Sequence, residues 1–155
     1  MPFQIHALPA QTFAPLFAAP PTILAQNHAT IVTADHAPGF PCRVSLADAK
    51  IGERVLLVNF THLPASSPFR SSHAIYVREG AHQAQLAPDV IPDVIASRLI
   101  SWRGFDAKFM MQQADVIEGH ALDSAIEAIF EDPKIEEIHL HFARQGCFAA
   151  RVTRG

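Results

Sequence analysis

Two histidines stand two residues apart near the C-terminus, His139 and His141, and Cys147 follows them closely. Alternate residues of a β-strand project to the same side, so the two imidazoles would share one face. Imidazole and thiolate groups bind zinc, and imidazole also binds iron or manganese. His139, His141 and Cys147 are therefore weak metal-ligand candidates, because no carboxylate stands at a diagnostic spacing. The competing interpretation is a histidine pair on the outer face of a sheet, half apolar and half hydrated.

Residues 138–152 predict the β-hairpin that would position these groups. A three-residue loop of Arg144, Gln145 and Gly146 makes both strands amphipathic together, and Gly146 suits the left-handed third position. The apolar face then carries the pairs Phe142–Phe148, Leu140–Ala150 and Ile138–Val152. The opposite face carries Ala143–Cys147, His141–Ala149 and His139–Arg151. This register predicts two imidazoles, a thiol and a guanidinium on the face opposite the apolar one.

Cys42 is a candidate nucleophile between Pro41 and Arg43. A reactive cysteine needs a cation or a helix N-terminus to stabilise its thiolate, and usually a histidine as base. On an extended strand Arg43 would point away from Cys42, so a partly buried structural cysteine is the competing interpretation. A Cys42–Cys147 disulfide is a further alternative, which the expected reducing compartment disfavours.

The segment 68–73 places Arg70 and His73 in a predicted loop, where functional residues are often found. His62, just past a central strand, is in similar surroundings. The alternative is a solvated loop whose serines cap their own turn. The candidate catalytic residues are Cys42, His73 and His139. The candidate ligand-binding residues are Arg43, Arg70, Arg151 and His141. If the three arginines converged, they would bind a carboxylate or phosphate through charge-assisted hydrogen bonds.

The elements expected to hold these residues indicate an α+β fold. Two helices are predicted, over 90–100 and 122–130, and apolar residues of the second follow helical spacing. Strands are predicted at 3–8, 29–34, 42–46, 53–60, 74–77 and 109–117, before the hairpin. We therefore expect a largely antiparallel sheet with two principal helices and a C-terminal β-hairpin.

Composition restricts the classes of protein to consider. The chain has 155 residues, of which 49% are hydrophobic and 17% charged, with a formal net charge of −3. This predicts one globular domain over 1–155 and argues against nucleic acid as a partner. The longest apolar runs are too short for a bilayer, and the segment from Met1 to His6 lacks the basic start and long apolar stretch expected of a signal peptide. We expect a cytoplasmic protein with reduced thiols and no membrane contact; the cofactors and the oligomeric state stay unknown.

Several blocks together resemble a bacterial domain-of-unknown-function family, the one numbered twelve hundred and three. The blocks that carry the likeness are Pro38–Leu46, Gly52–Leu57, Pro68–Arg70, Ile75–Glu79, His139 and Gly146–Arg151. The likeness extends from about residue 29 to residue 155. It implies a small, single-domain bacterial protein, and it implies no activity or functional residues.

The leading functional hypothesis is a protein that binds a small anionic molecule, with or without turnover. Its basis is the placement of arginines and histidines around strand ends and one hairpin face. A protein–protein interaction module, which docks a partner on the hairpin face or an edge strand, is one alternative. A metal-dependent enzyme that uses the His139/His141 pair is another.

Overall fold

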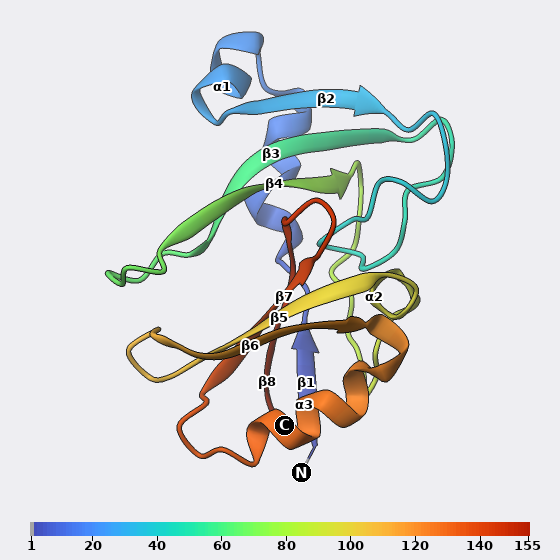
Figure 1. Ribbon diagram of the computed structural model, residues 1–155. Helices are drawn as coiled ribbons and strands as arrows, with labels where there is room; N and C mark the ends of the chain where they lie inside the picture. The colour runs from blue at the N-terminus through green and yellow to red at the C-terminus, as the bar shows by residue number, and fades with distance from the viewer. Residues whose placement is uncertain (1) are drawn as a thin grey trace. The chain divides into compact units, whose positions relative to one another are not determined.

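The computed structural model describes residues 2–155, which form two compact units (Figure 1). The first unit contains residues 2–6, 61–73 and 85–155, and the second contains 7–60 and 74–84. Strands β3 (Arg54–Leu63) and β4 (Ser71–Arg78) therefore each contribute one end to each unit. Each unit therefore combines segments that are not contiguous in the sequence. The expectation of one domain over 1–155 stays a prediction.

The first unit is built on a five-stranded antiparallel sheet in the order β1-β8-β7-β5-β6 (Figure 1). The bounds are Phe3–His6 for β1, Leu99–Phe105 for β5, Met111–Glu118 for β6, Glu137–Phe142 for β7 and Phe148–Arg154 for β8. The short helix α2 (Asp93–Ala96) and the 3-10 turn η3 (Gly119–Ala121) precede β5 and α3 respectively. The central strand β7 is buried from Ile138 to Phe142, so it forms the core of this unit.

Helix α3 (Leu122–Phe130) runs along one face of this sheet (Figure 1). Leu122, Ile126 and Ile129 are buried, at the i, i+4 and i+7 positions that fall on one side of a helix. Pro133 disfavours helical geometry in the residue before it, and the helix ends shortly upstream. The predicted helix over 122–130 is confirmed, and it covers the sheet face opposite His139 and His141.

The second unit holds a three-stranded sheet in the order β2-β3-β4, with β2 at Ala29–Thr33. Two 3-10 helices, η1 (Ala10–Thr12) and η2 (Ala14–Ala18), and the helix α1 (Pro21–Gln26) come before it. The main buried cluster of this unit consists of Phe13, Cys42, Val44, Leu56, Val58, Ile75 and Val77. The apolar, non-alternating centre of β3 fits its place as the middle strand.

Two sequence predictions of local structure are wrong. Residues 42–46 form a turn, in which the Leu46 amide donates to the Cys42 carbonyl and Leu46 has a φ of 50°. The helix predicted over 90–100 is reduced to α2, because Leu99 already begins β5. Pairing of β5 with both β6 and β7 decides the structure there, and the short apolar stripe is too weak to oppose it.

The C-terminal hairpin follows the predicted register only in part. Ile138–Val152, His139–Arg151 and Leu140–Ala150 pair as predicted. A bulge then pairs His141 with Phe148 instead of Ala149. Gly146 has a φ of +79°, as expected for its loop position. The bulge moves Phe148 to the histidine face, which corrects its predicted place on the opposite side.

The α+β class, the antiparallel strands and the C-terminal hairpin are confirmed. Among residues 2–155, no helix has the length and apolarity needed to cross a bilayer.

Candidate metal centre

One face of β7 carries Glu137, His139 and His141 at alternate positions. His139 pairs with Arg103 on β5 and with Arg151 on β8, so these residues share the same sheet face. His139 is 1% exposed and His141 is fully buried. The interpretation of these histidines as half-hydrated residues on an outer face is therefore wrong. Two buried imidazoles need polar partners, which other parts of the first unit supply.

Two further histidines lie against them, His62 near the end of β3 and His73 near the start of β4. The ring centroids of His62 lie 4.9 Å from those of both His73 and His141. His73 and His141 are 5.1 Å apart by the same measure. One ligand nitrogen from each of these three rings lies within 4.8 Å of the others. We call His62, His73, His139 and His141 the histidine cluster; all four belong to the first unit.

A chain of hydrogen bonds runs through part of this cluster. Glu137 Oε1 lies 2.7 Å from His139 Nε2, and His139 Nδ1 lies 2.8 Å from His62 Nδ1. The other nitrogen of His62, Nε2, lies 2.9 Å from the Ser71 hydroxyl. With an ionised carboxylate and neutral rings, one direction satisfies every group. Ser71 donates to His62, His62 donates to His139, and His139 donates to Glu137.

The ring of His141 is held by a backbone carbonyl of the hairpin loop. Its Nδ1 lies 3.1 Å from the Gly146 carbonyl oxygen and must carry the proton to donate to it. The other nitrogen, Nε2, then carries a lone pair. It is buried and has no hydrogen-bond partner among residues 2–155. A buried, unpaired acceptor costs free energy, and a metal ion would satisfy it.

Burial keeps the rings of His62 and His141 neutral. Burial, reinforced by the charge of Arg103, lowers the pKa of His141 to about 2. Burial, followed by the influence of His139 and His73, lowers the pKa of His62 to about 3. At neutral pH both imidazoles therefore offer a lone pair without first losing a proton. Metal ligation requires this neutral form.

Apolar and cationic residues surround the cluster. Phe148 stacks on His62 with ring centroids 4.8 Å apart and an interplanar angle of 10°, which the hairpin bulge makes possible. The guanidinium of Arg103 is partly buried, and burial lowers its pKa. The environment therefore combines low polarity with one positive charge.

The cysteines predicted as a nucleophile or a ligand lie elsewhere. Cys42 is buried in the second unit, where its Sγ accepts backbone N–H bonds from Ser45 and Arg78, both at 3.3 Å. Cys147 is half-buried in the hairpin loop and is outside the group of three ligand nitrogens. Neither cysteine is in a disulfide.

The three predicted anion-binding arginines have different surroundings. Arg43 is buried in the second unit, and its Nη1 donates to the Pro41 carbonyl at 2.6 Å. Arg70 is exposed and donates to the Pro64 carbonyl. Arg151 is exposed and donates to Glu137 Oε2 at 3.2 Å. Within the first unit, Arg70 and Arg151 therefore bind separate acceptors of the chain.

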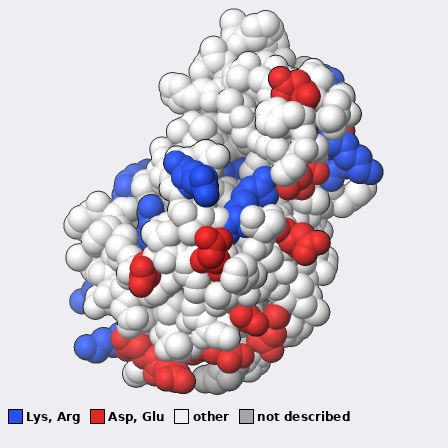
Figure 2. All heavy atoms as spheres, turned by 45° about the vertical axis from the view of Figure 1, so that its right-hand side comes forward, with Lys and Arg blue, Asp and Glu red and all other residues white. Residues whose placement is uncertain are grey.

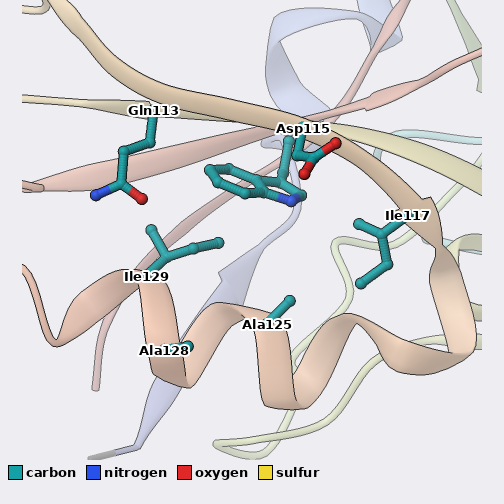
Figure 3. A pocket seen from close by; sticks show the side chains of 7 residues that line it. Gln113, Asp115, Ile117, Ala125, Ala128 and Ile129 are labelled. Carbon is teal, nitrogen blue, oxygen red and sulfur yellow. The ribbon is translucent and has the colours of Figure 1, made fainter.

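A hollow of the first unit lies between β6 and α3, on the sheet face opposite the histidine cluster (Figure 3). It encloses about 320 Å³ and is lined by Trp102, Gln113, Asp115, Ile117, Ala125, Ala128 and Ile129. Figure 3 shows Ala125, Ala128 and Ile129 facing the strand residues across it. None of its lining residues is a histidine, cysteine or arginine. Charged side chains of both signs are spread in small groups over the face drawn in Figure 2.

Sequence reasoning missed Glu137, Arg103 and the place of His62 beside His73 and His141. The spacing Glu137-x-His139-x-His141 is a signal that could have found the first, since all three residues share one strand face. His62 and His73 lie at the facing ends of two successive strands, which a hairpin would bring together. Arg103 carried no signal, because the predicted helix over 90–100 took in the start of β5 and no strand was predicted over 101–105.

Comparison with known proteins gives the family and no function. Residues 39–154 match the family described as "Protein of unknown function (DUF1203)". No curated protein and no solved structure matches the chain. The match covers well over half of the 155 residues and includes every member of the histidine cluster. The chain belongs to the DUF1203 family.

Proposed function

We propose that His62, His73 and His141 bind one divalent transition-metal ion and that the protein carries out metal-dependent chemistry there. The supporting observation is a group of three rings with one ligand nitrogen each within 4.8 Å of the others, in which the buried Nε2 of His141 lacks a hydrogen-bond partner among residues 2–155. Three protein ligands leave coordination positions open, as in catalytic zinc sites. The donor set suits zinc, cobalt or iron, and the ion would act as a Lewis acid on a bound oxygen.

Glu137 and His139 act in this proposal as positioning residues. Ligating histidines generally donate their second N–H to a carboxylate or carbonyl, which fixes the ring and its tautomer. His62 donates through His139 to Glu137, and His141 donates to the Gly146 carbonyl. Both proposed ligands thus already have the support that metal-bound imidazoles require.

Ser71 competes with the metal for one of these ligands. Its hydroxyl now lies 2.9 Å from His62 Nε2, the nitrogen that would ligate the ion. The same hydroxyl lies 3.1 Å from the Phe69 carbonyl, a second acceptor. Metal binding therefore requires that the hydroxyl turn from His62 to Phe69 and that the three rings move closer together, because Zn–N bonds are only about 2.1 Å long.

The test is metal titration of chelator-treated protein by calorimetry, with zinc and cobalt. We expect one ion per chain in the wild type. Replacement of a ligand, as in His73→Ala or His141→Ala, is expected to weaken affinity more than roughly a hundredfold. His120→Ala, an exposed histidine of the same unit, is the matched control. Equal affinity in all variants would refute the proposal, provided that circular dichroism shows each to be folded.

The hydrogen-bond chain favours a second candidate function, acyl transfer with Ser71 as nucleophile. His62 Nε2 would take the hydroxyl proton as Ser71 Oγ attacks the carbonyl carbon of an ester or amide, and would then give that proton to the departing alcohol or amine as its bond to the carbonyl breaks. His139 and Glu137 would hold the imidazolium formed in between. A fluorophosphonate probe would then label the wild type and not Ser71→Ala. The same variant separates the two candidates. Metal-centre function predicts that Ser71→Ala binds zinc at least as tightly, because it lacks the competing hydroxyl.

A further inference from the structure

The histidine cluster has a cation beside it that the proposed metal centre does not use. Arg103 lies directly across from His139 on the neighbouring strand, on the sheet face that carries His139 and His141. Its charge is close enough to both His62 and His141 to lower the pKa of each. Arg103 thus faces two of the three proposed metal ligands.

Arg103 has no hydrogen bond or ion pair with any of residues 2–155. Glu137, the carboxylate two residues before His139 on the same strand face, is already shared by His139 at 2.7 Å and Arg151 at 3.2 Å. A partly buried guanidinium without a partner retains its donors for a ligand. Its planar fork is suited to carboxylate and phosphate oxygens.

The charges of a metal-loaded centre also call for an anion. The two imidazoles with lowered pKa values are neutral, and Glu137 is balanced by Arg151. A divalent ion and Arg103 would then leave an excess positive charge in a partly desolvated site. An oxyanion with one oxygen on the metal and another on the guanidinium would neutralise it. Burial strengthens both interactions.

We propose that the centre binds a small oxyanion, a carboxylate or phosphate, bridged between the metal ion and Arg103. This inference rests on the proposed metal centre and names its ligand class. It also replaces Arg43, Arg70 and Arg151, the arginines predicted from the sequence to hold an anion. Arg103 fixes the orientation of the ligand while the metal polarises the oxygen bound to it.

The experiment uses cobalt-loaded protein, whose visible absorption bands change when the coordination of the ion changes. Inorganic phosphate and acetate are titrated separately at constant ionic strength. In the wild type we expect a saturable spectral change with at least one of them. Arg103→Met should bind cobalt at least as tightly, because a neighbouring positive charge is removed, and should lose roughly tenfold to a hundredfold in affinity for that anion, as expected for a lost charge-assisted contact.

Arg144→Met is the matched control, because it removes an exposed arginine of the same unit. It should leave both affinities unchanged. If cobalt does not bind the wild type, the metal centre and this inference both fall. If cobalt binds but neither anion changes its spectrum, or if Arg103→Met binds the anion as the wild type does, only the inference is overturned.

Discussion

Buried neutral histidine should make the first unit sensitive to acid, and His141→Asn isolates this effect. The ordinary pKa of histidine, 6.5, falls to about 2 for His141 in the folded protein. Below pH 6.5 the unfolded chain takes up a proton at this position and the folded chain does not. Stability from this residue is therefore fully present above pH 6.5 and is lost as the pH falls toward 2.

The size of the effect follows from the same two values. For each pH unit between these two pKa values, the free energy of unfolding falls by about 1.36 kcal/mol. A change from pH 7 to pH 5 crosses about 1.5 units of this range and therefore lowers the free energy of unfolding by about 2 kcal/mol. His141 is fully buried, so solvent screening calls for little correction. Asparagine cannot titrate, and its amide can replace the Nδ1–H that donates to Gly146.

The assay is urea unfolding at pH 5, 6 and 7 with chelator present, followed by the fluorescence of Trp102, which lies in the same unit. Between pH 7 and pH 5, the wild type should lose about 2 kcal/mol more free energy of unfolding than His141→Asn. His120→Asn, an exposed control, should behave as the wild type does. Equal losses in the wild type and His141→Asn would refute the burial of a neutral imidazole.

Two further predictions concern the support of the site and the packing of the fold. Glu137→Gln should weaken zinc binding by roughly tenfold to a hundredfold, because the carboxylate orients His62 through His139. Glu136→Gln, which changes an exposed neighbour, should leave the zinc affinity unchanged. Equal affinities of the two variants in calorimetry would contradict this role of Glu137. Gly119→Ala should cost roughly 3 kcal/mol in urea unfolding, because the new Cβ would lie 2.0 Å from the Ile95 carbonyl oxygen and 2.7 Å from that of Arg98. A fall in the free energy of unfolding of less than about 1 kcal/mol would show that the contact between Gly119 and the carbonyls of Ile95 and Arg98 relaxes easily.

Local sequence patterns predicted those elements whose structure depends mainly on their own residues. The apolar residues of 122–130 follow helical spacing in the sequence, and Gly146 indicates the hairpin loop. The segment 99–105 has no such pattern, and its strand exists because β6 and β7 pair with both of its edges. Long-range pairing of this kind cannot be predicted from local patterns in a single sequence.

The sequence singled out His73, His139 and His141 as candidates but did not predict that they lie together with His62. The shared strand face of His139 and His141 follows from alternation alone, and it is correct. Their partners are not local, since His62 and His139 are 77 residues apart. The bulge that brings Phe148 to this face also lies beyond simple alternation, because it shifts the register by one residue. Burial then depends on the whole unit, which is why an outer-face histidine pair was a reasonable but wrong alternative.

The most direct test of the central claim is the metal content of purified protein after reconstitution with zinc and removal of excess ion. The proposed centre predicts one zinc per chain in the wild type and in His120→Ala, and less than a tenth of that in a His73→Ala/His141→Ala double variant that remains folded. Zinc retained by the double variant at the wild-type ratio, or absent from a folded wild type, would contradict a metal centre built from these histidines.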